Sequence, residues 1–184
     1  LNERIFYSKA DLDSWSPVTK NHVADGMTIK DLCAAAISYS DNTAAILLVN
    51  KLGGVQAVDV FARSIGDSTF NLTHDFPREA ASIPGDVNDT TTPQAMAQTY
   101  QKLVLGNVLA DPERNLLVTW MKETVTGINR IHAGIPADWI EADKTGTGSG
   151  YGTTNDAAIL WPPKHAPIIL VVYFTQHDKN ANKR

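Results

Sequence analysis

The sequence predicts an α+β fold in which a helical region comes first and an antiparallel sheet follows. Segments with helical periodicity and helix-capping signals fill most of the chain up to about residue 127. After Pro136 the character changes to three short apolar runs, joined by turns that contain glycine and proline. Helices and strands that are segregated along the chain in this way indicate an α+β arrangement and not a regular βαβ alternation.

The chain opens with a predicted strand over residues 1–7, followed by a loop that ends at Trp15-Ser16-Pro17. The stretch Thr28-Ile29-Lys30-Asp31 then resembles a capping box, in which side chains at a helix start bind free backbone N–H groups. We expect a helix from that point. The apolar spacing turns one set of its residues inward: Ile29, Leu32, Ala36 and Ile37.

Further helices are predicted before the sheet, and glycine or proline delimits each of them. Their expected ranges are about 43–52, 55–64, 93–106 and 111–126. Gly53-Gly54 and Gly66 suit helix C-termini, because glycine accepts the left-handed conformation found there. Thr92-Pro93 and Asp111-Pro112 suit N-termini, because proline fits the first helical turn. The connection 67–92 is polar and unusually long, and ordered loops of such length are often functional.

Three strands are predicted after these helices, over residues 139–147, 157–161 and 168–175. The composition is that of a globular protein, with 43% hydrophobic and 20% charged residues. A formal net charge of -4 argues against a nucleic-acid or membrane-surface role, since both usually need a basic face. Cys33 lies in an apolar run, so we expect either a buried inert thiol or half of a disulfide with a partner outside this sequence.

Two short motifs carry the chemistry that the sequence suggests. Ser40-Asp41-Asn42 lies between two predicted helices, and Lys144-Thr145-Gly146 lies on the first of the late strands. The first motif alone could be a simple turn with a helix cap, because its residue types all suit caps. A phosphate-cradling loop at 146–152 is disfavoured, because that loop leads into a strand and not a helix. In this order and context, the two motifs match the signature of class A β-lactamases and penicillin-binding proteins.

The resemblance to class A serine β-lactamases extends over nearly the whole chain. Other matching segments include Trp15–Thr19, Asp25–Thr28, Ser64–Asp67, Ile83–Asp86, Asp89–Pro93, Val118–Lys122, Pro136–Trp139 and Tyr151–Asp156. Thr147, directly after the K-T-G glycine, is similar to the extended-spectrum and carbapenem-hydrolysing branches. The resemblance implies that residues 1–27 form the start segment and cleft-mouth loop of an α/β domain. Residues 28–127 would then form a helical domain, and 128–184 the antiparallel strands of the α/β domain.

The family's reaction is acyl transfer, in which a serine attacks the strained amide and water later releases the acyl group. By resemblance, Lys144 offers positive charge to the substrate carboxylate and eases proton transfer through Ser40 to the leaving nitrogen. The hydroxyls of Thr145 and Thr147 are expected to bind the same carboxylate. Gly146 lets the substrate lie against the strand edge, and the N–H of Thr147 is an expected oxyanion-hole donor.

Three more residues are expected around the cleft by resemblance. Asn42 matches the residue that holds the acylamino carbonyl of the substrate, and Arg130 matches an arginine that reaches toward the carboxylate. Trp15 matches the aromatic at the mouth of the cleft. Plainer interpretations stay open for two of them: Trp15 could be core packing and Arg130 a solvated surface charge. The family implies no metal and no other cofactor.

The sequence departs from the family in its nucleophile, because no S-x-x-K motif occurs in the 184 residues. The look-alike Ser68-Thr69-Phe70-Asn71 has asparagine in place of lysine and follows Ser40 instead of preceding it, so we reject it. The family's motif would fall before Leu1, and the helix expected after Thr175 has no counterpart in the polar tail at 177–184. With nothing to cover the second face of the sheet, we expect this chain to be part of a longer protein.

A second departure lies in the long loop. The family's loop reads arginine, any residue, glutamate, and an asparagine four positions later, and the glutamate activates the deacylating water. Gapless alignment places His74 at the arginine and Phe76 at the glutamate, with Ala80 at the asparagine. Asp89 still matches the aspartate that pairs with the arginine. Glu79, three positions after Phe76, is the candidate replacement base if the loop folds differently.

Three functional hypotheses follow from these residues. The first is β-lactam hydrolysis through a serine acyl-enzyme. The second is a penicillin-binding or acyl-trapping protein that cannot deacylate, which the loop substitutions favour. The third is an inactive fragment that a missing N-terminal segment complements. In all three the partner is a small-molecule β-lactam, with no nucleic acid or membrane, and the complete protein is a monomer. A periplasmic or secreted location is implied by resemblance.

Overall fold

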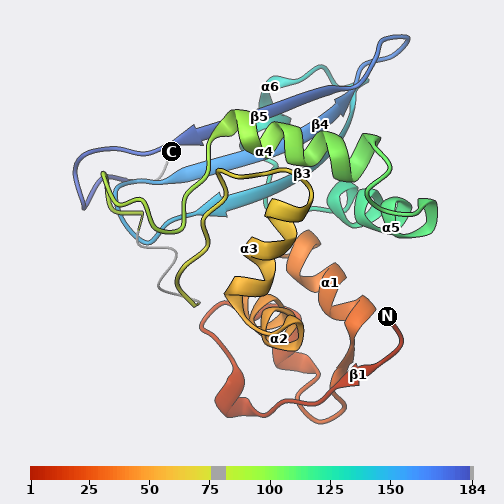
Figure 1. The fold of residues 1–184 in the computed structure, drawn as a ribbon, viewed down its shortest axis with the longest axis vertical. Helices are drawn as coiled ribbons and strands as arrows, with labels where there is room; N and C mark the ends of the chain where they lie inside the picture. The colour runs from red at the N-terminus through yellow and green to blue at the C-terminus, as the bar shows by residue number, and fades with distance from the viewer. Residues whose placement is uncertain (76–81, 183–184) are drawn as a thin grey trace.

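The computed structural model describes residues 1–75 and 82–182 and contains a helical region and an antiparallel sheet (Figure 1). The sheet has the order β3-β4-β5, formed by Ile140–Thr147, Thr154–Trp161 and Ile168–Phe174. Lys144 of β3 lies opposite Ala157 of β4, which lies opposite Val171 of β5. Within the described ranges, β3 and β5 are therefore the edge strands. The predicted α+β order, with helices first and sheet last, is confirmed.

Most helices begin and end close to the residues that their capping signals indicate. Thr28 Oγ1 accepts a hydrogen bond from the N–H of Asp31 at 3.1 Å, and Asp41 Oδ1 accepts one from the N–H of Ala44 at 2.9 Å. Gly53, with a φ of 104°, ends the second helix. The α-helices are α1 Ile29–Ser38, α2 Asn42–Leu52, α3 Val55–Ser64, α4 Pro93–Tyr100, α5 Asp111–Lys122 and α6 Ile131–Gly134. Shorter elements are 3-10 turns at Lys9–Asp11 and Thr19–Asn21 and a π-helical turn at Gln101–Leu105.

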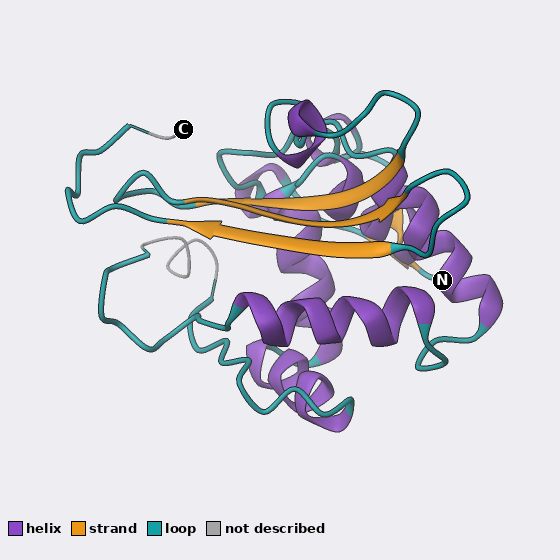
Figure 2. Cartoon of the chain, turned by 90° about the horizontal axis from the view of Figure 1, so that it is seen from above, coloured by secondary structure: helices purple, strands orange, loops and turns teal. Residues whose placement is uncertain are grey.

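Alternation along the strands decides which side chains of the sheet face the helices. Ala142, Ile159 and Ile169 point to one face, where they pack in a cluster with Val104 and Met121. This face lies against α4 and α5, and Figure 2 shows the strands nearly edge-on with a helix running parallel below them. The opposite side of β5 keeps a row of partly exposed apolar side chains: Ile168, Leu170, Val172 and Phe174.

A second apolar cluster lies under the first helices. It contains Tyr7, Met27, Leu32, Ala35 and Ala44. Helix α1 joins the two clusters, because Ile37 packs against the cluster on the sheet. The hydroxyl of Ser38 also donates to the carbonyl oxygen of Trp120 at 2.7 Å. These contacts hold the end of α1, and with it Ser40, against the sheet.

The structure corrects several predicted elements. The first strand, β1, covers only Arg4–Ile5 and pairs with Met27–Thr28, which form the unpredicted strand β2. Two residues are too few to show a period, and the same reason explains why the four-residue helix α6 was missed. Helix α5 ends at Lys122 and not near residue 126. Strand β4 begins at Thr154 and not at residue 157. The prediction missed its first three residues because they are polar.

The buried face of α1 also differs from the prediction. Its buried residues are Leu32, Ala35 and Ser38, whereas Ile29, Ala36 and Ile37 are half-buried. Cys33 is a free thiol and is half-buried. In the described part of the chain, no single helix is long and apolar enough to cross a membrane. Helices α2 and α3 pass that test only together, as a pair bent by 74°.

Candidate active site

Ser40 lies in the turn between α1 and α2, where the backbone is held in an unusual conformation. Its φ is 55°, in the left-handed region that residues other than glycine seldom adopt. The neighbouring Asp41 is fully buried and accepts hydrogen bonds from the N–H groups of Val18, Thr19 and Ala44, each at 2.9 Å. Asp41 is therefore the helix cap, and its bonds also fix the turn that presents Ser40.

The two motifs meet across the fold. Lys144 Nζ donates a hydrogen bond to Ser40 Oγ at 2.8 Å, although the two residues are 104 positions apart. Nζ also donates to the carbonyl oxygen of Thr145 at 2.8 Å. Burial lowers the pKa of Lys144 to about 8, although the charge of Asp143 opposes the shift. The Lys144 ammonium therefore gives up its proton more readily than an ordinary lysine, as a proton relay requires.

Two buried carboxyl groups lie on the sheet face opposite Lys144, and sequence reasoning missed them. Burial raises the pKa of Asp143 to about 7, with the charge of Asp156 adding to the effect. Burial also raises the pKa of Asp156. Asp143 Oδ2 and Asp156 Oδ1 are buried without a hydrogen-bond partner among the described residues. A Cβ at Gly127 would clash with the Asp143 carboxylate, so glycine there makes room for it. Asp143, an acidic residue inside a predicted strand, was the available signal, whereas Asp156 lay just before the strand predicted at 157–161.

Arg130 joins the ends of β3 and β4. Its guanidinium donates to the carbonyl oxygen of Gly146 at 2.8 Å, to that of Asn155, and to Thr147 Oγ1 at 2.5 Å. These bonds exclude the solvated-surface interpretation of Arg130. They use Nη1 and Nη2 to hold the strand end that carries Thr147, and the expected role of Arg130 toward a substrate carboxylate stays a prediction.

Along β3, side chains alternate, so Lys144 points toward the helices and Thr145 and Thr147 point away from them. Thr145 is buried with its Oγ1 2.7 Å from Thr126 Oγ1, whereas Thr147 is exposed. A Cβ built on Gly146 would lie 3.6 Å from the nearest atom of β4, an ordinary contact. The described chain therefore gives no packing reason for glycine at 146. Its missing side chain leaves the edge of β3 open to a ligand.

Trp15 and Asn42 lie together beside the Ser40 turn. The carbonyl oxygen of Trp15 accepts the N–H of Asn42 at 3.0 Å, and Asn42 Nδ2 donates to Asp13 Oδ1 at 2.8 Å. The Trp15 ring is not core packing, since the residue is 55% exposed and its Nε1 reaches only the carbonyl oxygen of Tyr39 at 3.4 Å. An exposed aromatic ring at this position is available to contact a ligand.

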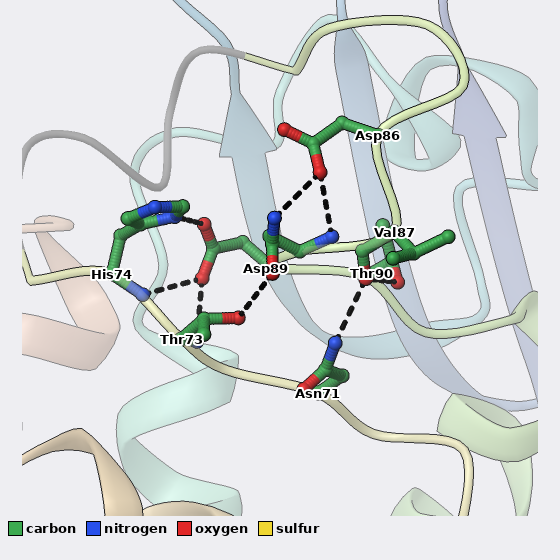
Figure 3. A network of polar contacts seen from close by, with 8 residues as sticks. Asn71, Thr73, His74, Asp86, Val87, Asp89 and Thr90 are labelled. Atoms are coloured by element: carbon green, nitrogen blue, oxygen red, sulfur yellow. Dashed lines mark hydrogen bonds and ion pairs between the residues drawn. The ribbon is translucent and has the colours of Figure 1, made fainter.

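The two ends of the long loop 67–92 are joined at Asp89 (Figure 3). Asp89 Oδ1 accepts hydrogen bonds from the N–H groups of Thr73 at 2.7 Å and His74 at 2.9 Å. Asp89 Oδ2 lies 2.6 Å from His74 Nδ1. The structure thus joins the two positions that the alignment pairs, with histidine in place of arginine. Three residues of the predicted loop chemistry lie outside the described residues: Phe76, Glu79 and Ala80.

A cavity of about 850 Å³ lies between this loop and the sheet. Lys144, Thr145 and Gly146 line it from β3, and His74 and Asp89 line it from the loop. Five predicted residues are not part of its lining: Trp15, Ser40, Asn42, Arg130 and Thr147. Among the residues that the structure describes, no group of three or more His, Cys, Asp or Glu could hold a metal ion.

Comparison with known proteins agrees with this arrangement. A model of the β-lactamase enzyme family matches residues 1–184. Among curated relatives, β-lactamase OXY-1 of Klebsiella oxytoca is 51% identical over 184 residues, and β-lactamase Toho-1 of Escherichia coli is 50% identical. Each alignment covers 100% of this chain and 63% of the relative. The chain thus spans less than two thirds of the length of these relatives.

Solved structures show the same likeness. A β-lactamase from Desulfarculus baarsii DSM 2075 has a TM-score of 0.98 at 48% identity, over 100% of this chain and 68% of that chain. An ancestral class A β-lactamase has a TM-score of 0.94 at 51% identity, over 98% of this chain and 69% of that chain. The chain therefore belongs to the class A β-lactamase family.

Proposed function

We propose that this chain carries the proton-relay and substrate-binding part of an enzyme that hydrolyses β-lactams through an acyl-enzyme. The observation that carries the proposal is the 2.8 Å hydrogen bond from Lys144 Nζ to Ser40 Oγ beside an open strand edge. The family mechanism assigns the nucleophile to a serine in an S-x-x-K motif, which residues 1–184 do not contain. Residues 1–184 instead supply the groups that transfer protons to the leaving nitrogen and the groups that bind the substrate.

The relay acts when the amide bond of the β-lactam breaks. The departing nitrogen needs a proton, and the hydroxyl of Ser40 gives one as the C–N bond cleaves. Lys144 Nζ, which already donates to Ser40 Oγ, replaces that proton. Because burial lowers the pKa of Lys144 to about 8, this second transfer costs less than it would from an ordinary lysine.

The open edge of β3 holds the substrate. A ligand along this edge meets the charge of Lys144 and the backbone at Gly146, where no side chain intervenes. The hydroxyls of Thr145 and Thr147 bind its carboxylate, and the N–H of Thr147 contributes to an oxyanion hole. Asn42 and Trp15 contact the substrate from the turn on the other side.

The loop leaves a second function open, because the alignment places Phe76 where the family has its base for deacylation. A protein without any base would form the acyl-enzyme and release it slowly, as a penicillin-binding or acyl-trapping protein does. Glu79 is the carboxylate that could serve instead. Export from the cytoplasm and a monomeric state are further parts of this proposal, and they follow from family membership.

The test is a burst experiment on the natural gene product that contains residues 1–184, mixed with a chromogenic cephalosporin. Sustained turnover supports the hydrolase, and a single stoichiometric burst supports the acyl-trapping protein. Intact mass spectrometry of the same mixture reports the acyl adduct directly. The absence of both adduct and turnover, in a folded protein, contradicts the proposed function.

A further inference from the structure

The contact between His74 and Asp89 fixes a histidine ring at the wall of the cavity. Burial alone would raise the pKa of Asp89, but hydrogen bonds from the backbone N–H groups of His74 and Thr73 outweigh it and hold the pKa below its ordinary value. Asp89 is thus a carboxylate, which only accepts hydrogen bonds. Its partner His74 Nδ1, at 2.6 Å, must therefore carry the proton.

This arrangement leaves the other ring nitrogen of His74 as a base. In a neutral imidazole with its proton on Nδ1, Nε2 carries a lone pair. The His74 side chain is 40% exposed and lines the same cavity as Lys144, so water reaches the ring. A carboxylate that orients a histidine through Nδ1 and leaves Nε2 to take a proton is a recurrent device in hydrolases.

The backbone also shows that this pair is held in place against strain. Asp89 has a φ of 55°, in the left-handed region that residues other than glycine seldom adopt. Three hydrogen bonds to its carboxylate hold it there. Strained residues that are fixed in this way tend to lie at functional sites.

The other titratable groups that line the cavity are less suited to take a proton from water. They are Asp86, Asp89, Tyr100, Lys144, Asp156 and Tyr173. Burial raises the pKa of Tyr173 to about 12 and raises the pKa of Tyr100, so both phenols keep their protons. Asp156 Oδ2 accepts the N–H of Ile131 at 3.1 Å, and Asp156 Oδ1 is buried away from water. Lys144 donates to Ser40, and Asp89 is occupied by its three donors.

The last of these groups is Asp86, whose Oδ1 accepts hydrogen bonds from the backbone and side-chain nitrogens of Asn88 at 2.9 and 2.8 Å. His74 is accordingly the described lining group with an oriented, accessible lone pair.

We propose that His74, oriented by Asp89, is the general base that activates the deacylating water in this enzyme. The inference rests on the proposed function. His74 Nε2 removes a proton from water while the water oxygen attacks the ester carbonyl of the acyl-serine. The tetrahedral intermediate then collapses, its ester C–O bond breaks, and the serine oxygen takes the proton from Nε2. The products are the ring-opened acid, free serine and neutral His74.

The test compares His74→Asn with the parent gene product. Asparagine keeps an N–H donor for Asp89 but has no basic nitrogen. We expect acylation of His74→Asn by a penicillin to keep its rate, and release of the acyl group to slow by about 10²–10⁴-fold. His132→Asn is the matched control, because His132 Nδ1 also lies 2.7 Å from a carboxylate, that of Glu141, but does not line the cavity. Time-resolved intact mass measures both steps.

A second variant separates catalysis from structural support. In His74→Ala, added imidazole should restore release of the acyl group, and in His132→Ala it should change nothing. Release from folded His74→Asn at a rate within twofold of the parent would overturn the inference, as would a parent that never clears its adduct. A parent that forms no adduct at all would instead overturn the proposed function. The two failures are therefore distinguishable in one set of traces.

Discussion

At the scale of single residues, Lys144 and Arg130 are two cations beside the same strand end with different partners. Lys144 donates to the Ser40 hydroxyl, which belongs to the proposed relay. Arg130 instead donates its described hydrogen bonds to other protein groups, namely two backbone carbonyl oxygens and the Thr147 hydroxyl. Their positions could be predicted from family motifs. The partners of Arg130 could not, because they depend on how β3 and β4 end.

We therefore expect Lys144→Ala to lower kcat/KM far more than Arg130→Ala does in the natural gene product. Losing Lys144 removes a proton-transfer step, which is typically worth about 10²–10⁴-fold in rate. Losing Arg130 loosens a strand end and leaves the relay in place. Steady-state kinetics with a cephalosporin measures both variants. An equal or greater loss for Arg130→Ala would show that Arg130 is the principal cation of the site.

Asp143 gives a prediction about pH and stability. Its pKa is raised from 3.8 to about 7 in the folded protein, so the folded state binds the proton more tightly than the unfolded state does. The stabilisation is complete below pH 3.8 and is lost as pH rises toward 7, by at most about 1.4 kcal/mol per pH unit. Asp143→Asn, which resembles the neutral acid, should therefore flatten the fall in stability between the ordinary pKa of 3.8 and the raised pKa of about 7.

Urea unfolding at several pH values measures this slope, and the exposed Asp138→Asn is the control. Equal slopes of stability against pH in the parent and in Asp143→Asn would mean that the Asp143 carboxyl does not titrate in this pH range. Asp156 and Glu141 have pKa values that burial also raises, so some slope should remain in the variant.

At the scale of elements, helix ends followed the sequence closely because caps are local chemistry. Thr28 and Asp41 bind the N–H groups that a capping residue is expected to bind. The short strands β1 and β2 were harder, because a two-residue ladder depends on pairing across 20 or so residues and leaves no local period. The His74–Asp89 contact was expected only from alignment, since nothing in the composition of loop 67–92 marks those two residues as partners.

The loop gives an element-scale prediction through Asp89. The amide N–H groups of Thr73 and His74 donate hydrogen bonds to the Asp89 carboxylate, which should slow their exchange with solvent. Asp89→Ala should remove this protection. It should lower global stability by only about 1–3 kcal/mol, because the apolar clusters do not include this loop. Asp86→Ala is the matched control, since the carboxylate of Asp86 accepts hydrogen bonds only from Asn88 among the described residues. Unchanged protection of both amides in Asp89→Ala would show that the Asp89 carboxylate does not hold residues 73 and 74 in solution.

At the scale of the whole molecule, the relay is built by packing and not by sequence proximity. Helix α1 spans the two apolar clusters, and its end sets Ser40 against β3, so a contact across 104 residues depends on both clusters. Ile37 and Ser38 are the residues that make this link, through the sheet cluster and the carbonyl oxygen of Trp120. The sequence alone could show that both motifs exist, but only the packed fold brings their side chains within hydrogen-bond distance.

The whole-molecule prediction is that a chain with the proton relay but without the nucleophile does not hydrolyse β-lactams. Residues 1–184 contain no S-x-x-K, so this chain produced alone should hydrolyse no β-lactam at a useful rate. Removing the nucleophile of a serine hydrolase typically costs about 10⁶-fold in turnover. Nitrocefin hydrolysis by the purified chain, with its intact mass verified, measures this. A rate well above that of a Lys144→Ala control would show that Ser40, which already receives a hydrogen bond from Lys144, serves as the nucleophile itself.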